Sequence, residues 1–341
     1  MPIEYPLENG GGVVSEHHSV RERVGLFDVS HLGKISVSGD QALEFLNQAL
    51  TNDLNRITDG QAQYSMLCDE LSGGVVDDLI AYRKSERDFL LVPNASNSAE
   101  VFNRLKAKAP SGLTIVNMHR EYAVFAIQGP LSQQVLKSLG INLELEYMSF
   151  AEANINNAHL IICRTGYTGE FGYEILPNWK DAELVWSLLH KSVIALNGLV
   201  CGLGARDTLR TEMGYPLHGH ELSLEITPVQ AGASWAVGWK KENFWGQAAL
   251  ASERASGPKR ILRGILLQDR GIPRPGMQVS QDEHIIGEVT SGTFSPTKKA
   301  GIALALISPE VSIDSQVSID IRGKKVPATV VKTPFVPARV R

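Results

Sequence analysis

The sequence predicts an α+β protein whose C-terminal part is a separate β-barrel or β-sandwich. Up to Leu250, strand patterns with alternating apolar residues are interspersed with amphipathic helix patterns. Beyond Pro258 the chain carries only short strand patterns, divided by Gly, Pro and Asp turns. Its 341 residues exceed what one hydrophobic core usually organises, so we expect two or three domains.

The α+β part begins with a strand and a helix. Residues 33–39 alternate between apolar and polar side chains like a strand, and residues 40–50 form an amphipathic helix with Asp40 as its N-cap. Two strands and a helix follow, which is a β-β-α arrangement. The remaining elements predicted here are strands at 75–82, 88–92, 121–127 and 159–163 and helices at 98–108, 132–139 and 182–196.

The β part follows a small and polar stretch. Residues 251–258, Ala-Ser-Glu-Arg-Ala-Ser-Gly-Pro, are predicted to form a linker, which places the domain boundary between Leu250 and Lys259. The strands predicted after it span 263–267, 287–292, 301–307 and 317–321.

Charge, cysteine content and hydropathy exclude several classes of function. A formal charge of −4 and a pI of about 6.2 provide no basic field that would attract nucleic acid. Cys68, Cys163 and Cys201 form no C-x-x-C pair, which argues against a disulfide framework and a zinc ribbon. No apolar run approaches the roughly 18 residues that span a bilayer, and the start of the chain lacks a signal-peptide pattern. We expect a cytoplasmic protein that binds neither nucleic acid nor membrane.

Two adjacent carboxylates, Asp77 and Asp78, interrupt the apolar strand predicted at 75–82. An ionised carboxylate in such a strand is destabilising unless a partner compensates for its burial. Adjacent strand residues point to opposite faces, so the two cannot share a proton and at most one faces a site. The alternative, that nearby backbone amides satisfy both carboxylates, is equally compatible with the sequence.

Residues 166–175 form a glycine-punctuated turn that leads into a strand beginning near Phe171. On this strand Glu174 shares a face with Gly172, which has no side chain and leaves room for a flat ligand. A carboxylate there can accept two parallel hydrogen bonds from a heterocycle with an amine and a ring N–H, as pterin and guanine-like rings present. The alternative is a Glu at a strand edge, paired with Lys or Arg.

A helix is predicted at 203–213, where charged residues interleave with apolar residues at helical spacing. Arg206 on this helix either belongs to a solvated face or an intrahelical ion pair, or reaches a pocket and binds an anionic partner.

Two weaker patterns carry no prediction of a site. Residues 202–207 begin like a dinucleotide fingerprint, but Asp207 stands where the third glycine belongs, so no nicotinamide site is expected. The pairs His17-His18 and His218-Gly-His220 lack a metal-binding pattern, and histidines of this kind usually satisfy local hydrogen bonds. We therefore expect no metal.

Taken together, these segments resemble the aminomethyltransferase family, the T-proteins of the glycine cleavage system, over nearly the whole chain. The resemblance rests on the order and spacing of many motifs, and such a series is far less expected by chance than any single motif. The matching segments span 26–33, 73–80, 92–97, 166–175, 201–214, 225–228, 289–296 and 334–337.

The resemblance implies a fold and a domain division. Two α+β domains of ferredoxin-like type surround a central folate cavity, and a β-barrel follows them. The first domain is discontinuous and comprises residues 1–38 and 124–250; the second is inserted at 39–123; the barrel occupies 251–341.

The resemblance also implies a reaction dependent on tetrahydrofolate, with no metal, flavin or nicotinamide. Family members take the aminomethyl group from the lipoyl arm of the H-protein and form 5,10-methylenetetrahydrofolate, ammonia and dihydrolipoyl H-protein. The P- and L-proteins act in the same system, and we expect this chain to be a monomer. The catalytic aspartate of the family falls on Asp78, whose carboxylate can orient the folate nitrogens, take up a proton and stabilise an iminium cation.

The folate-binding residues of the family are carried over by motif. By residue type alone Trp235 is more typical of a core anchor, and Arg339 is the candidate for a C-terminal residue that closes the folate site. Whether Arg206 meets the pterin or the glutamyl carboxylates stays open. The positions implied are Glu174, Arg206, Asn94, Tyr167, Tyr215, Trp235, Tyr64, Leu32 and Arg339.

Three departures from the family pattern stand out. The chain begins inside the usual N-terminal stretch, so a leading strand and helix are expected to be missing. The segment 64–74 is one residue longer than the pattern, which weakens the assignment of Tyr64. Leu32 replaces the commoner Met, a mild change in a packed site.

Three alternative functions share this fold. A folate-binding factor for iron–sulfur proteins would carry a Lys-Gly-Cys-Tyr-type motif near 166–170, whereas this chain has Arg164-Thr-Gly-Tyr-Thr; Cys163 is offset and fits a buried structural thiol. A folate-dependent demethylase of a small sulfonium or amine shares the pocket and is excluded less firmly. A non-catalytic folate-binding protein is disfavoured by Asp78.

Overall fold

The computed structural model describes residues 2–6 and 11–341. The chain divides into two compact units, the first with residues 1–65, 79–206 and 339–341 and the second with residues 66–78 and 207–338. Strand β4 (Val75–Ser85) therefore begins in the second unit and ends in the first. No helix within the described ranges is long and apolar enough to cross a bilayer.

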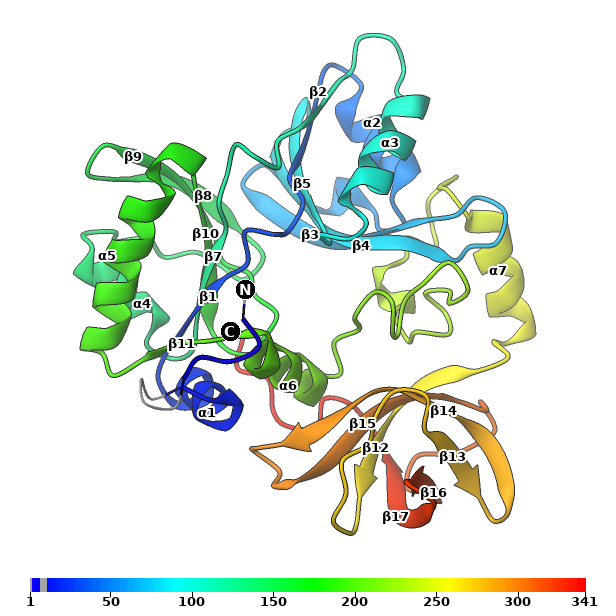
Figure 1. Ribbon diagram of the computed structural model, residues 1–341. Coiled ribbons are helices and arrows are strands. Elements are labelled where there is room, and N and C mark those ends of the chain that lie inside the picture. Colours follow the sequence, from blue (N-terminus) through cyan, green and yellow to red (C-terminus); the bar gives the residue numbers. More distant parts are fainter. Residues whose placement is uncertain (1, 7–10) are drawn as a thin grey trace. The chain divides into compact units, whose positions relative to one another are not determined.

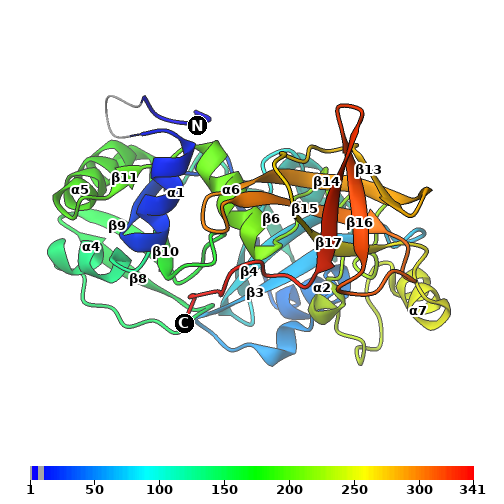
Figure 2. The same cartoon turned by 90° about the horizontal axis from the view of Figure 1, so that it is seen from below.

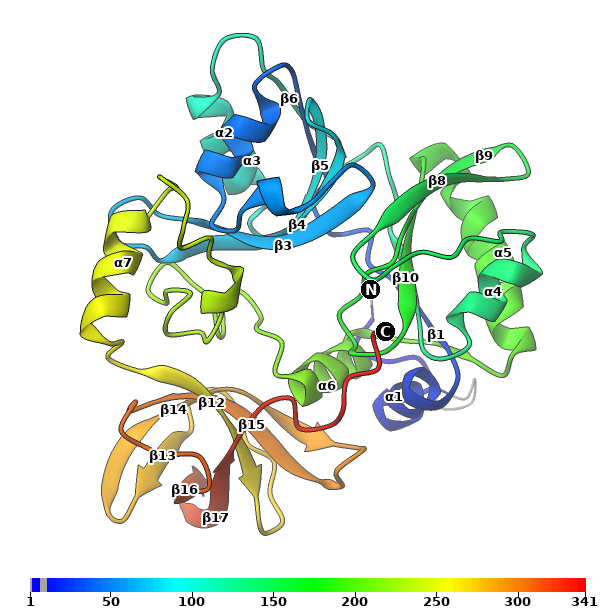
Figure 3. The ribbon, with the colours of Figure 1, turned by 180° about the vertical axis from the view of Figure 1, so that it is seen from behind.

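A six-stranded sheet of order β11-β1-β7-β10-β9-β8 lies in the first unit. β1 (Gly25–Asp28) runs parallel to β11 (Leu199–Val200), and the other neighbouring pairs are antiparallel. Helices α4 (Ser132–Ser138) and α5 (Ala182–Ala195) lie against one face, as Figures 1 and 3 show. The remaining strands are β7 (Phe125–Gln128), β8 (Phe150–Ile155), β9 (Ala158–Cys163) and β10 (Gly172–Pro177).

The core of this sheet explains where Glu174 points. Tyr173 and Ile175 on β10 pack into an apolar cluster with Val185 and Leu189 of α5. Because side chains alternate along a strand, Glu174 lies on the face away from this core. The alternation predicted for β10 is confirmed.

A second sheet, of order β3-β4-β5-β2-β6, has helices α2 (Ala42–Ala49) and α3 (Ser98–Lys108) on one face (Figure 1). The apolar stripe of α3 buries Val101 and Leu105. The other strands are β2 (Ile35–Ser38), β3 (Gln61–Cys68), β5 (Asp88–Pro93) and β6 (Thr114–Asn117). Helix α1 (Val13–Glu22) and the short helices η2 (Leu54–Arg56) and η3 (Trp179–Asp181) complete the described elements of the first unit.

The second unit contains a closed barrel of six antiparallel strands, seen from below in Figure 2. Its order is β12-β15-β14-β13-β16-β17, and alternate residues such as Ile265, Ala305 and Val330 fill the interior. The sequence predicted either a barrel or a sandwich, and the closed sheet shows that this part is a barrel. The strands are β12 (Ile261–Leu267), β13 (Gln278–Gln281), β14 (His284–Ser295), β15 (Ala300–Ile307), β16 (Gln316–Ile321) and β17 (Lys324–Val331).

Most predicted elements exist, with shifts at their ends. Helix α3 has the predicted bounds, whereas β4 continues to Ser85 and β7 begins at Phe125 instead of residue 121. The predicted N-cap Asp40 is wrong: α2 begins at Ala42 behind Gln41, and Asp40 pairs with Arg87 instead.

The predicted linker at 251–258 is also wrong, because most of it belongs to helix α7 (Gln247–Ser256). Ala, Glu and Arg favour a helix, and Leu250 anchors α7 by complete burial. Gly257, with φ 82°, adopts the left-handed conformation common after a helix. The α+β class with a C-terminal barrel is confirmed, and the three-domain division stays a prediction.

Candidate folate site

The loop between β9 and β10, residues 164–171, is the structural centre of the candidate site. Gln128 of β7, which is buried, donates to the carbonyl of Thr165 at 3.1 Å and accepts from the hydroxyl of Thr168 at 2.8 Å. A Cβ atom at Gly166 would lie 2.0 Å from Oε1 of Gln128, and one at Gly172 would lie 2.5 Å from its Nε2. Gly166 and Gly172 therefore allow the loop and the start of β10 to approach Gln128 closely, and a side chain at either position would displace Gln128.

Glu174 of β10 is a buried carboxylate with one oxygen held in place. Its Oε2 accepts a 2.6 Å hydrogen bond from Thr165 and a longer one, 3.5 Å, from the hydroxyl of Tyr82. Burial, with Cys163 and Glu174 nearby, raises the pKa of Tyr82 well above its ordinary value, so the phenol stays a donor. Oε1 has no hydrogen-bond partner among the residues that the structure describes. A buried carboxylate of this kind is prepared to accept hydrogen bonds from a ligand.

Arg206 lies on helix α6 (Leu203–Met213), and its guanidinium carbon is 4.5 Å from the ring centroid of Tyr167 in the 164–171 loop. Both side chains are half-buried. The stacking fixes the guanidinium plane and leaves a positive charge beside the loop. The sequence left open whether Arg206 lies on a solvated face of the helix or reaches a pocket. Its half-buried position against Tyr167 excludes a fully solvated face.

The turn before β2 lies in the electrostatic field of Arg206. Desolvation of the His31 ring and then the charge of Arg206 lower the pKa of His31. Its neighbour Leu32 is 9% exposed, and the carbonyl of Leu32 contacts Nδ1 of His119 at 3.2 Å. Lys34 is completely buried and donates to the carbonyl of Ser30 at 2.9 Å.

Arg339 meets the same loop from the end of the sequence. Its backbone amide donates to the carbonyl of Gly169 at 2.7 Å, and Arg339 forms a parallel bridge with Glu170. The exposed guanidinium of Arg339 donates to the carbonyl of Arg21 at 3.3 Å. The 164–171 loop thus connects Glu174 through Thr165, Arg206 through Tyr167, and Arg339 through Gly169.

The paired carboxylates on β4 differ in burial. Asp77 is fully buried, whereas Asp78 is half-buried. This difference agrees with opposite orientations on one strand. Asp78 belongs to the second unit, and its catalytic role stays a prediction.

The other candidates are divided between the units. Asn94 and Tyr64 are half-buried residues of the first unit, and Tyr64 accepts from Asn52 through its carbonyl at 2.9 Å. Tyr215 and Trp235 belong to the second unit. Trp235 is 67% exposed, so the alternative of a core anchor is wrong.

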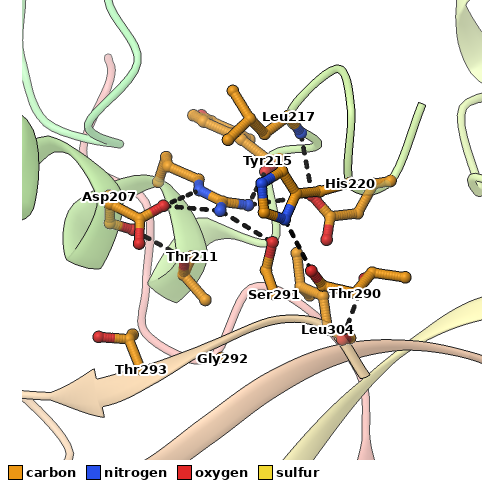
Figure 4. A network of polar contacts seen from close by, with 12 residues as sticks. Asp207, Thr211, Tyr215, Leu217, His220, Thr290, Ser291, Gly292, Thr293 and Leu304 are labelled. Atoms are coloured by element: carbon orange, nitrogen blue, oxygen red, sulfur yellow. Dashed lines mark hydrogen bonds and ion pairs between the residues drawn. The ribbon is translucent and has the colours of Figure 1, made fainter. Parts of the chain in front are cut away.

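The other charged residues of α6 form ion pairs and hydrogen bonds with neighbouring side chains. Arg210 forms ion pairs with Asp207 at 2.6 Å and Glu221 at 3.0 Å and donates to Ser291 of β14 at 2.8 Å. Figure 4 labels Asp207 and Ser291 within this network. The intrahelical pair predicted by the helical spacing is therefore present. Glu212 is buried and accepts hydrogen bonds from the hydroxyls of Ser295 and Thr297, at 2.5 and 3.0 Å.

The histidines and cysteines have local explanations. His218 contacts the carbonyl of Val75 at 3.1 Å and His220 that of Thr290 at 2.8 Å. Across the described parts of the chain, no group of three His, Cys, Asp or Glu side chains could hold a metal ion. The three cysteines are free and buried, and burial raises the pKa of Cys163 well above its ordinary value, so it is not a nucleophilic thiolate.

Sequence reasoning missed Thr165, Tyr82 and Arg164. Thr165 directly precedes the segment 166–175, but its hydrogen bond to Glu174 depends on how the loop folds back beside β10. Tyr82 comes from the second sheet, and no local pattern relates it to β10. Of the three, only Arg164 has a signal in the sequence, because it is a cation at the end of an apolar run.

Comparisons with known proteins identify the family of the chain. Residues 1–241 match the family model of the GCVT N-terminal domain, and residues 260–337 match that of the glycine cleavage T-protein C-terminal barrel domain. The aminomethyltransferase of Parafrankia sp. (strain EAN1pec) is 56% identical over 342 residues, covering 100% of this chain and 93% of the relative. That of Mycobacterium tuberculosis (strain H37Rv) is 54% identical over 343 residues, covering 100% and 92%.

A solved structure supports the fold independently. The crystal structure of the glycine cleavage system aminomethyltransferase T from Bartonella henselae superposes with a TM-score of 0.90 at 35% identity and covers 98% of this chain and 91% of that chain. Both family models, the full-length relatives and this structure lead to one conclusion: the chain belongs to the glycine cleavage T-protein family.

Proposed function

We propose that this chain, an aminomethyltransferase of the glycine cleavage system by its family and full-length relatives, uses tetrahydrofolate as acceptor and the lipoylated H-protein as donor. The observation that carries the proposal is the arrangement around the 164–171 loop. One buried carboxylate, Glu174, and two arginines contact the same loop, Arg206 through its guanidinium and Arg339 through its backbone amide. A pterin with an acidic tail offers the complementary groups.

The pterin is assigned to Glu174. The exocyclic amine and the adjacent ring N–H of a pterin are parallel donors, and a carboxylate accepts them with both oxygens. Thr165 and, at 3.5 Å, Tyr82 both donate to Oε2, which leaves the lone pairs of Oε1 available to the ligand. The ring of Tyr167, held by Arg206, is a flat neighbour for the heterocycle.

The glutamyl tail is assigned to the guanidinium groups. Guanidinium groups such as those of Arg206 and Arg339 bind carboxylates with two parallel N–H donors. Arg339 is exposed, as a group that contacts the distal part of a ligand is expected to be. These contacts increase affinity without taking part in bond formation.

The reaction exchanges two bonds to one carbon. The C–S bond to the lipoyl arm and the C–N bond to the leaving ammonia break, while N5 and N10 of tetrahydrofolate each form a bond to that carbon. Two protons leave the folate nitrogens, and the lipoyl sulfur and the leaving amine each gain one. Asp78 is the proposed carboxylate that orients the folate amine, accepts a proton from it and stabilises the intermediate iminium cation.

The same proposal includes the partner proteins, the oligomeric state and the cellular compartment. The H-protein delivers the substrate on its lipoyl arm, and the P- and L-proteins act before and after this step. The chain is further proposed to act as a monomer in the cytoplasm; for the compartment, the three free, buried cysteines are typical of a reducing environment.

The test is a transfer assay with purified components. The chain is mixed with tetrahydrofolate and aminomethyl-loaded H-protein, and methylenetetrahydrofolate and ammonia are measured over time. Unloaded H-protein is the control for carrier-independent product. Formation of both products in equal amounts supports the proposal. If the carrier is inert and a free sulfonium or amine is demethylated instead, the chain is a demethylase.

A further inference from the structure

The segment 339–341 is attached to the 164–171 loop at two points. The amide of Arg339 donates to the carbonyl of Gly169, as described above, and the carbonyl of Val340 accepts a 2.5 Å hydrogen bond from Nη2 of Arg164. In Figure 3 the C-terminal end lies beside β10. The second attachment depends on one side chain, Arg164.

Arg164 is held in an aromatic cage. Its guanidinium carbon lies 3.5 Å from the ring centroid of Phe171, 5.6 Å from that of Tyr173 and 5.9 Å from that of Tyr147. The side chain is 2% exposed, and Nη1 donates to the carbonyl of Gly172 at 3.2 Å. The rings and carbonyls therefore fix the plane of the guanidinium.

This placement is unusual for a buried cation. Within the described part of the chain, no carboxylate lies at ion-pair distance from Arg164, and its Nε has no hydrogen-bond partner. Burial of an arginine without a carboxylate is destabilising. If Arg164 only filled space in the fold, an apolar side chain of similar volume would serve as well. We therefore infer that its guanidinium is needed for its hydrogen bonds.

We propose that Arg164 is a positioning residue that fastens the segment 339–341 to the 164–171 loop and thereby holds Arg339 and Tyr167 in place for the folate. The inference rests on the proposed function, because the benefit of the fastening is tetrahydrofolate binding. Arg164 itself does not contact the reacting atoms.

A second contact supports the same arrangement. Arg21 of α1 donates to the carboxylate of Glu170 and to the carbonyl of Thr168, at 3.0 and 2.8 Å, and its own carbonyl accepts from the side chain of Arg339. Arg21 and Glu170 are both buried. Arg21 of α1 therefore holds the loop at Thr168 and Glu170, and the segment 339–341 contacts both Arg21 and the loop residue Arg164.

The test compares three variants with a matched control. Arg164→Met keeps volume and removes the donors, Arg164→Lys keeps the charge, and a chain ending at Ala338 removes the fastened segment. The control is Arg83→Met, because Arg83 is also a buried arginine, and among the described residues its side chain bonds to Asp59, Ile57 and Glu86 instead of the loop.

Steady-state kinetics separate positioning from a general loss of stability. We expect Arg164→Met to raise the KM for tetrahydrofolate about tenfold with kcat within about twofold, and the truncated chain to do the same. Arg164→Met combined with the truncation is expected to add nothing further. Arg164→Lys is expected to be intermediate, because an ammonium lacks the planar fork. The control is expected to keep its KM.

A second readout does not depend on activity. Hydrogen exchange of the peptide that contains Arg339 is expected to accelerate in Arg164→Met without folate and to stay unchanged in Arg83→Met. Unchanged exchange, or KM effects of Arg164→Met and truncation that multiply, would overturn the inference. Absence of any transfer by the unmodified chain would instead count against the proposed function.

Discussion

The hydroxyl of Thr165 donates a 2.6 Å hydrogen bond to Oε2 of Glu174 and so connects the 164–171 loop with strand β10. Both residues are buried, and Tyr82 adds a donor from the second sheet. The carboxylate is thus oriented before any ligand arrives. Because an oriented group loses less conformational freedom on binding, this bond is expected to increase folate affinity.

Removal of that hydroxyl tests the orientation of Glu174. Thr165→Val keeps the shape of the side chain and removes the donor, so we expect the KM for tetrahydrofolate to rise about tenfold, in keeping with a hydrogen bond to a charged group. Thr165→Ser retains the hydroxyl and is the control. Equal KM values for the two variants in the transfer assay would show that the orientation of Glu174 does not matter.

Asp78→Asn tests the proposed carboxylate of the reaction. The amide keeps the shape but cannot accept a proton, so kcat is expected to fall roughly 100- to 10,000-fold while the Kd for tetrahydrofolate stays within about threefold. Asp88→Asn, at the half-buried start of β5, is the control and is expected to keep its kcat. Unchanged turnover of Asp78→Asn, measured with the same loaded H-protein, would refute the role of Asp78.

Buried Lys34 predicts a pH dependence of stability. Burial lowers its pKa to about 8 from the ordinary value of 10.5, so the unfolded chain binds this proton more tightly than the folded chain. The destabilisation from charging Lys34 is therefore complete below pH 8 and disappears as the pH rises towards 10.5. Against Lys34→Met, the free energy of unfolding of the unmodified chain should gain about 1 kcal/mol between about pH 8.5 and 9.5.

The measurement for Lys34 is chemical unfolding at several pH values. Lys191→Met, at an exposed position of α5, is the matched control, and its difference from the unmodified chain is expected to stay flat over the same range. A flat difference for Lys34→Met as well would mean that Lys34 binds its proton equally tightly in the folded and unfolded chains, so that burial does not lower its pKa.

Local sequence patterns predicted elements better than they predicted contacts. Helix α3 has its predicted bounds because its apolar stripe and its position between strands are local signals. Helix α7 was missed, since Ala, Ser and Gly-Pro resemble a linker unless the burial of Leu250 is known. The face of Glu174 followed from strand alternation, which depends only on spacing.

The contacts of the site required the three-dimensional structure. Tyr82 and Thr165 are far apart in sequence and meet only because two sheets of the first unit bring them together. The positions of Arg206 and Arg339 came from the family resemblance, and only the structure relates both to one loop. Charged residues that meet across long sequence separations have no local signature, because most Asp, Glu and Arg side chains lie on the solvated surface.

The network around Arg210 predicts that two of its carboxylates differ strongly in their effect on stability. The side chains of Arg210 and Glu221 are 2% and 0% exposed, whereas that of Asp207 is 48% exposed. Glu221→Gln removes the buried carboxylate that faces a buried guanidinium and is expected to lower the free energy of unfolding by about 3 kcal/mol. Asp207→Asn is expected to lower it by less than about 1 kcal/mol, because water screens that pair. Urea unfolding of both variants decides, and equal losses would show that burial does not set the strength of the network.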